Sequence, residues 1–336
     1  VEDPKSGETK RVSFDYQSEG AHVMGCAAAP NGTICGGTAF PMRFFSYDPK
    51  KDDWVRREAY GQWNTVAPLG DRFFVGAYSG GHLLEWEPAR PWVTTREGDE
   101  KSNPRYLVGV EPVVNRPHDL LAQPDGKWVI MAGTPGYGLT GGGLLFWDRQ
   151  ARRATVLEHT QIIPDHSTMS LAPLPGGKLL GGTTIAPGTG GRTKAKQAEL
   201  YIMDLETQRL EWHQVVFPDA TTYTDLLAGP DGLVFGFANG QRFFVFDAAK
   251  RQVIHQEETA ATFGRTSGGQ GPRVFVTAPD GRIFILFSRG IASLNPKTFQ
   301  ITMLAESPVP INVGGDYLDG RIYFASGSHI YSYQVP

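Results

Sequence analysis

One short string, repeated with variations along the chain, constrains the fold more than any other feature. Residues 224–232 read TDLLAGPDG, residues 118–126 read HDLLAQPDG and residues 273–281 read RVFVTAPDG. Weaker copies lie at residues 26–32, 171–177 and 316–320. Each copy is an apolar run followed by a turn of Gly with Pro, Asn or Asp. Such turns accept the positive φ that a two-strand reversal needs. Each copy therefore predicts a β-hairpin.

The spacing of the hairpins predicts how they assemble. They recur about every forty to fifty residues, and in an all-β chain such a repeat is typical of a β-propeller. The predicted strands group into seven blades of four antiparallel strands each. The last blade is the exception, because the C-terminal end of the chain supplies only three of its strands. Residues 10–16 alternate apolar and polar, and we expect them to supply the missing strand and remove both sheet edges. The sequence thus predicts one all-β domain over residues 1–336, a seven-bladed β-propeller closed by its N-terminal strand, with six or eight blades as alternatives.

Two local expectations accompany this assignment. In the second blade, the outer strand is expected near residues 92–96, and the charged segment 97–115 is interpreted as an insertion between blades. The only cysteines, Cys26 and Cys35, flank one hairpin turn. In the expected register their side chains lie on opposite faces of the pleat. This arrangement predicts two free, buried thiols rather than a disulfide.

Composition excludes several classes of partner. Lys plus Arg total 32 against 35 for Asp plus Glu, which gives a formal charge of -3 and no sign of the basic face that nucleic acids require. No apolar run approaches the ~18–20 residues that span a bilayer. We therefore expect a monomer with neither a nucleic-acid nor a membrane partner. The sequence starts at Val1 without Met or a signal peptide, which is typical of a processed chain and favours a secreted or periplasmic location.

Candidate site residues gather where the inner strands begin. In a propeller these strand starts, and the loops between second and third strands, share one face around the central channel. The polar residues at the strand starts are His22, Gln62, Asn64, His118, His166, Tyr223, Arg273 and Asn312. His118 lies six residues before its turn proline, but His22 lies eight and His166 nine residues before theirs. Convergence of the three histidines is one interpretation, and local capping of backbone groups is the other.

Two long loops are expected on the same face. Residues 134–142 include Tyr137, and residues 183–198 carry Arg192, Lys194 and Lys196, while Arg43 comes from the first blade. A structureless loop of this length in a compact fold usually has a function. Cations gathered on one face of a mildly acidic protein suit an anionic ligand. The alternative is a mobile, solvated flap.

The string RPHDLLAQPDG at residues 116–126 and its repeats resemble the seven-bladed propellers related to virginiamycin B lyase and to the oligogalacturonate and ulvan lyases. The resemblance is one of architecture and covers nearly the whole chain. In those lyases a His or Tyr removes a proton next to a carbonyl or carboxylate, and a cation stabilises the enolate. Some of them hold a divalent metal on histidines. The resemblance implies β-elimination on an anionic, uronic-acid-containing glycan in the central pocket.

The residues offer groups for each role in such a reaction. His118 or His166 is the candidate base, Tyr223 the acid and Arg273 the cation. The expected substrate-binding residues are His22, Arg43, Gln62, Asn64, Tyr137, Arg192, Lys194 and Asn312. If His22, His118 and His166 converge, they could hold Zn, Mn or Ca, with Gln62 or Asn64 as a fourth ligand. A lactone or ester hydrolase using the same histidines, and a non-catalytic propeller that binds a glycan or a protein, are the alternatives.

Overall fold

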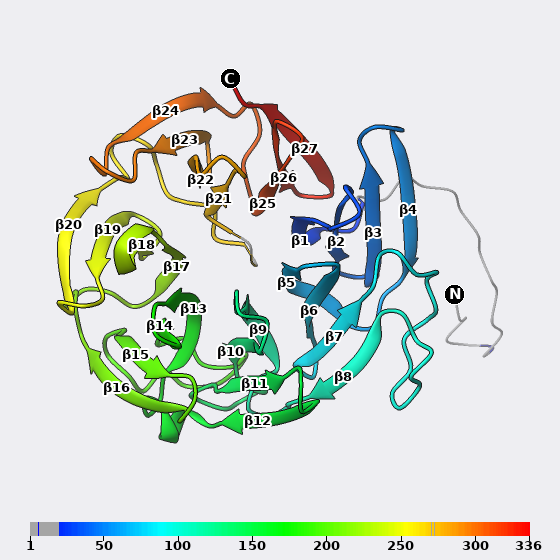
Figure 1. Ribbon diagram of the computed structural model, residues 1–336, viewed down its shortest axis with the longest axis horizontal. Coiled ribbons are helices and arrows are strands. Elements are labelled where there is room, and N and C mark those ends of the chain that lie inside the picture. The colour runs from blue at the N-terminus through cyan, green and yellow to red at the C-terminus, as the bar shows by residue number, and fades with distance from the viewer. Residues whose placement is uncertain (1–5, 7–19, 270, 272) are drawn as a thin grey trace.

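The computed structural model describes residues 6, 20–269, 271 and 273–336, and its strands form seven antiparallel sheets arranged in a ring (Figure 1). Six of these sheets have four strands, and the last has three among the described residues. The seven-bladed, all-β prediction is confirmed. The expected closing strand at residues 10–16 lies outside the described residues.

Blades 1 to 4 take their strands in chain order. They are β1 (Val23–Ala28), β2 (Ile34–Thr38), β3 (Arg43–Asp48), β4 (Asp53–Glu58), β5 (Gln62–Leu69), β6 (Arg72–Tyr78), β7 (His82–Trp86), β8 (Arg105–Gly109), β9 (Arg116–Ala122), β10 (Trp128–Thr134), β11 (Leu144–Asp148), β12 (Arg153–Leu157), β13 (Ser167–Leu174), β14 (Lys178–Thr184), β15 (Leu200–Asp204) and β16 (Arg209–Gln214).

Blades 5 to 7 continue the same order. They are β17 (Tyr223–Ala228), β18 (Leu233–Ala238), β19 (Arg242–Asp247), β20 (Gln252–Glu258), β21 (Phe275–Thr277), β22 (Ile283–Phe287), β23 (Gly290–Leu294), β24 (Ile301–Glu306), β25 (Val313–Leu318), β26 (Arg321–Ser326) and β27 (His329–Gln334). Two short 3₁₀ turns, η1 (His159–Gln161) and η2 (Pro230–Gly232), complete the described elements.

The repeated strings form the hairpins between the first and second strands. In the PDG and PNG turns the glycine adopts positive φ, for example 77° at Gly126 and 85° at Gly281, where a side chain would be strained. The inner strands β1, β5, β9, β13, β17, β21 and β25 lie nearest the centre of the ring in Figure 1. We call the face of the ring where these strands begin the upper face.

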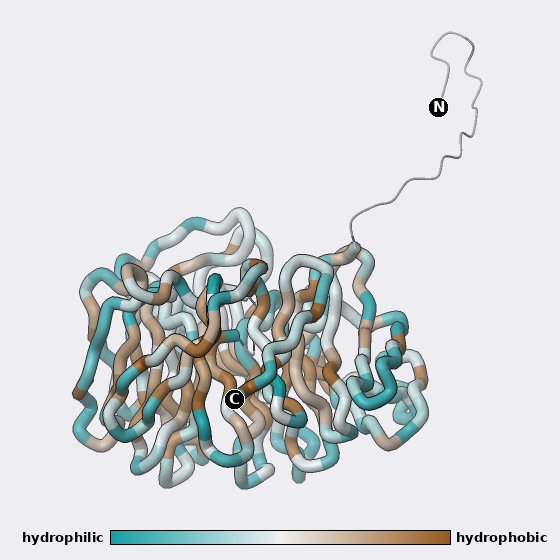
Figure 2. Tube along the Cα trace, turned by 90° about the horizontal axis from the view of Figure 1, so that it is seen from above, coloured by the Kyte–Doolittle hydropathy of each residue, from teal (hydrophilic) through white to brown (hydrophobic). Residues whose placement is uncertain are grey.

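Hydrophobic packing between neighbouring blades holds the ring together. Figure 2 shows apolar segments in the body of the ring, with hydrophilic turns at both faces. Cys35 is buried between the first two blades, and Cys26 is buried between the first and last blades beside Val313 and Tyr323. Both thiols are free, and Ala27 pairs with Cys35, as the sequence predicts.

The outer strand of the second blade differs from the prediction. It is β8, and the segment expected as a strand near residues 92–96 belongs to a loop within the blade, between β7 and β8. Asn103 organises this loop, since its Nδ2 donates to the carbonyls of Glu87, Arg90 and Pro91 at 3.0–3.1 Å. The prediction failed because this side-chain network replaces strand pairing there, and residues 97–115 are not an insertion between blades. No helix in the described ranges is long and apolar enough to cross a membrane.

Candidate functional site

A β-bulge at the same height in several inner strands sets the register of the channel. The bulged residues are Met24, Asn64, His118, Met169 and Thr224. All except Asn64 lie six residues before a turn proline, and Arg273 lies six residues before Pro279. A bulge re-aims a side chain and leaves its backbone unpaired in the ladder. His118 and Arg273 therefore share one register, which His22 and His166 do not.

Arg273 lies inside the channel rather than on the open face. Its side chain is only 1% exposed, and its Nη2 donates to the carbonyls of His118 at 2.6 Å and Met169 at 2.8 Å. Asp119 and Asp225 lie 4.0 and 3.9 Å from its guanidinium nitrogens. Burial raises the pKa of Asp119 to about 6, although the charge of Arg273 opposes this shift. The predicted cation is thus enclosed by carbonyls and carboxylates.

A small upper-face pocket of about 190 Å³ combines the groups that chemistry needs. It lies at the meeting point of blades 2, 3 and 4, and is lined by Tyr78, Asn115, Arg116, His118, Thr134, Pro135, Ala186, Pro187 and Thr189. The guanidinium carbon of Arg116 lies 4.8 Å from the centre of the Tyr78 ring, and the Tyr78 hydroxyl hydrogen-bonds that of Tyr137. His118 Nε2 lies 3.2 Å from Thr134 Oγ1.

Arg116 supplies the positive charge of this pocket. Among the described residues no carboxylate forms an ion pair with it. Asn115 fixes the adjacent backbone, since its Oδ1 accepts a hydrogen bond from Gly80 N–H at 2.8 Å. The pocket therefore brings a cation, an imidazole and the Tyr78 phenol together in a half-buried setting, where electrostatic interactions are stronger than in water.

The two long loops form one wall of this pocket. Gly138 N–H donates to Thr189 O at 2.9 Å, and Gly188 N–H donates to Leu139 O at 3.1 Å. Thr140 Oγ1 reaches the carbonyl of Arg192 at 2.7 Å. A Cβ at Gly188 would lie 2.2 Å from Gly136 O, so this approach requires glycine. The loop of residues 183–198 is thus pinned to the blade 3 loop and is not a solvated flap.

Two predicted catalytic residues lie elsewhere. Both ring nitrogens of His166 lie 2.8 Å from backbone carbonyls, those of Pro164 and Gln197, which matches the capping interpretation. Tyr223 is fully buried between blades 4 and 5 with Phe217 and Phe244, where burial raises the pKa of its hydroxyl. Neither lines the upper-face pocket.

The predicted substrate-binding residues divide in the same way. Tyr137 reaches the pocket through Tyr78, whereas the others are exposed or paired elsewhere. His22 and Arg192 are exposed. Two cations form ion pairs, Arg43 with Glu58 at 3.5 Å and Lys194 with Asp165 at 3.6 Å. The three amides are hydrogen-bonded: Gln62 donates to Asn64 at 2.6 Å, Asn64 donates to Pro117 O at 3.4 Å, and Asn312 accepts from Gly327 N–H at 3.1 Å.

The metal hypothesis gains no support from the geometry. The described part of the chain contains no group of three His, Cys, Asp or Glu residues placed to hold an ion. Binding at His22, His118 and His166 would also require the His166 ring to give up a carbonyl contact. A metal at these histidines stays a prediction.

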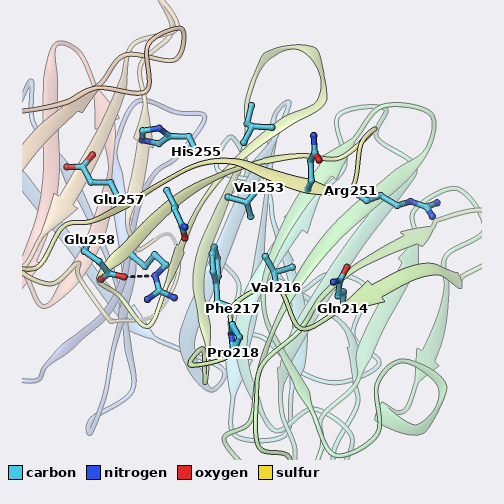
Figure 3. A pocket seen from close by; sticks show the side chains of 13 residues that line it. Gln214, Val216, Phe217, Pro218, Arg251, Val253, His255, Glu257 and Glu258 are labelled. Carbon is cyan, nitrogen blue, oxygen red and sulfur yellow. Dashed lines mark hydrogen bonds and ion pairs between the residues drawn. The ribbon is translucent and has the colours of Figure 1, made fainter.

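A larger surface groove, about 920 Å³, lies on the outer rim between blades 4 and 5 (Figure 3). Its Arg242 forms ion pairs with Asp219, at 2.6 Å, and with Glu258. The dashed line at Glu258 in Figure 3 marks the ion pair between Glu258 and Arg242. Its His255 packs on the Phe299 ring, with 5.4 Å between centroids. We place the candidate site in the smaller pocket because its Arg116 forms no ion pair with a described carboxylate and lies with an imidazole and the Tyr78 phenol.

Sequence reasoning found His118 and Tyr137 but missed Tyr78 and Arg116. Arg116 begins the quoted string RPHD and could have been found as the residue two before the bulge. Tyr78 ends a second strand in another blade, and no local pattern marks it.

Together, the ring and the pocket define the chain as a seven-bladed β-propeller with a cationic pocket on its upper face. No protein-family model matches the chain, and no curated protein matches its sequence. Among solved structures, the β-propeller domain of Cps50 (Swd1) from Myceliophteria thermophila is similar, with a TM-score of 0.63 and 11% identity over 94% of this chain and 97% of that one. Because 1319 solved chains are similar, this likeness identifies the fold and not an activity.

Proposed function

We propose that the upper-face pocket binds the carboxylate of a uronic-acid-containing sugar and catalyses β-elimination, so that the protein is a carbohydrate lyase. The observation that carries the proposal is the Arg116 guanidinium, which pairs with no carboxylate of the described ranges and lies over the Tyr78 ring in the pocket that His118 also lines. A fixed cation beside a carboxylate stabilises the enolate that forms when the neighbouring carbon loses its proton. The architectural resemblance to lyase propellers points to the same chemistry.

Each step has a residue of suitable type. His118 takes the proton from the carbon next to the carboxylate, and the electron pair left behind forms a carbon–carbon double bond. The bond from the next carbon to the glycosidic oxygen breaks, and Tyr78 gives its hydroxyl proton to that oxygen. Tyr137, hydrogen-bonded to Tyr78, orients this hydroxyl. Of the two candidate bases from the sequence, the proposal keeps His118 rather than His166, and Tyr78 replaces Tyr223 as the acid.

The size of the pocket favours a small substrate. Its volume of about 190 Å³ is below the ~300–1,000 Å³ of typical drug-sized sites. The pinned loops close one side of it. We therefore propose that the pocket accepts the terminal residue of a short glycan rather than the middle of a polymer.

The test is an assay of uronate oligomers for the absorbance of a conjugated double bond. Arg116→Met should raise KM and lower kcat/KM about 10²-fold or more, because the lost cation bound both ground state and transition state. Arg289→Met removes an exposed cation elsewhere on the upper face and is the control. Equal losses in both variants, or hydrolysis products without a double bond, would contradict the lyase assignment; the latter result would favour the hydrolase alternative.

A second candidate, protein binding, is favoured by one apolar surface. Phe40 is 76% exposed and Val93 41% exposed, and each directly precedes in the chain a residue, Pro41 or Thr94, that lines a hollow of about 300 Å³. Exposed apolar patches of this kind mark interaction sites. Phe40→Ser should abolish capture of a partner and leave elimination unchanged, which separates the two functions.

A further inference from the structure

Arg273 and His118 lie in one register but do different work. Both lie six residues before a turn proline, and in β9 this position, His118, is a bulge. The bulge takes the His118 carbonyl out of the β-ladder. Arg273 reaches across the channel from blade 6 and donates to this carbonyl at 2.6 Å and to the Met169 carbonyl at 2.8 Å.

Burial makes these two bonds consequential. The Arg273 side chain is 1% exposed, so water cannot replace its hydrogen bonds to the two carbonyls. A buried cation of this kind must be held by carbonyls or carboxylates. The carboxylates of Asp119 and Asp225 lie 4.0 and 3.9 Å away, outside direct hydrogen-bond distance, and each of them also binds backbone amides.

We propose that Arg273 is a positioning residue for His118. The Arg273 side chain fixes the bulge at His118 and so aims the imidazole into the upper-face pocket. It does not touch the substrate, since it lies outside the pocket lining. The proposal deepens the proposed lyase function and rests on it for its catalytic meaning. The structural part, a backbone clamp across the channel, stands on the two hydrogen bonds alone.

The experiment follows the imidazole directly. In histidine-labelled protein, His118→Gln identifies the His118 ring signals by NMR. Arg273→Met should then displace those signals by more than a linewidth, while the exposed His213 and His329 on outer strands stay in place. Arg282→Met, which removes an exposed arginine of the same blade, should leave all of them unchanged. Unmoved His118 signals in folded Arg273→Met protein would overturn the proposal.

Two further measurements keep the test decisive. If Arg273→Met does not fold, Arg273→Lys keeps the charge but loses the planar fork, and should displace the same signals by a smaller amount. In the wild type, the Arg273 Nη2 protons should exchange with solvent much more slowly than those of Arg282. Fast exchange, or an unmoved His118 in Arg273→Lys, would overturn the clamp.

Kinetic measurements then separate the positioning role of Arg273 from the proposed lyase function. On a uronate substrate, Arg273→Met should lower kcat about tenfold or more and leave KM within about twofold, because the carboxylate is bound by Arg116. A raised KM with unchanged kcat would contradict positioning. If the wild type eliminates no uronate at all, the proposed function fails, while the NMR result still decides whether Arg273 holds the His118 bulge.

Discussion

Asp316 accepts a hydrogen bond from the backbone N–H of Ala28, with 3.0 Å between Oδ2 and the nitrogen, and so joins the last blade to the first. Val23 N–H donates to Gly327 O at 2.9 Å across the same seam. The described residues therefore join the two ends of the ring through their inner strands.

The Asp316 contact recurs around the ring. Asp119 accepts from Leu171 N–H at 2.7 Å, and Asp225 accepts from Val274 N–H at 2.9 Å. Each carboxylate reaches the inner strand of the next blade. Blades 3, 5 and 7 thus share one device for holding their neighbours.

Removing the Asp316 carboxylate should weaken ring closure. Asp316→Ala leaves the Ala28 N–H without its partner, and we expect a loss of about 1–3 kcal/mol in the free energy of unfolding, measured with urea. Asp53→Ala is the control, because exposed Asp53 accepts from Trp54 N–H at 2.9 Å where water can replace it. Equal losses in the two variants would show that the hydrogen bond between Asp316 and Ala28 stabilises the fold no more than an exposed hydrogen bond does.

The same carboxyls predict an unusual pH dependence. Burial raises the pKa of Asp119 and of Asp316 to about 6. Since an unfolded Asp has a pKa of ~3.9, the folded state favours the protonated form. Their contribution to stability is full below about pH 4 and is lost as the pH rises through 6, on the order of 2 kcal/mol for each group. In urea unfolding from pH 4 to 8, Asp119→Asn/Asp316→Asn should give a flatter curve than wild type, and parallel curves would contradict this assignment.

The pinned loop should resist proteolysis. Trypsin sites at Arg192, Lys194 and Lys196 lie in the loop that Gly188 packs against blade 3. Gly188→Ala should increase the cleavage rate about tenfold, equivalent to ~1.4 kcal/mol less opening free energy. Gly268→Ala is the control, since its Cβ would meet nothing within 4 Å. Rapid cleavage of the wild type itself would mean that the wall of the pocket is not formed.

The two thiols should report on unfolding. Cys26 and Cys35 are both 0% exposed, and burial raises the pKa of each thiol. Because the thiolate is the reactive form, neither should react with a thiol reagent in native protein at neutral pH. Two thiols per chain should react in denaturant without prior reduction. A single burst of reaction in the native state would contradict the buried placement.

The fold was readable from sequence because each hairpin carries its own turn chemistry. The PDG turns showed where each inner strand ends, and the alternation of apolar and polar residues showed where the second and third strands of each blade lie. The outer strand of blade 2 could not be placed, since the contacts of Asn103 to carbonyls 12–16 residues away leave no periodic pattern.

The site was only partly readable. His118 was found because it begins a repeated string, but grouping it with His22 and His166 ignored the bulge, which sets the direction of each side chain. Arg273 shares the register of His118, yet its length carries the guanidinium across the channel to backbone carbonyls. Tyr78 comes from another blade, and the packing of blade 2 against blade 3 brings it to Arg116.

The most direct test of the proposed site is a crystal structure of the His118→Gln variant soaked with a uronate oligomer. This variant lacks the proposed base, so the substrate should remain intact. We expect the carboxylate of the terminal sugar on the Arg116 guanidinium, with the glycosidic oxygen within hydrogen-bond distance of the Tyr78 hydroxyl. An oligomer bound in the groove between blades 4 and 5, or an upper-face pocket that stays empty at saturating ligand, would contradict the proposed function.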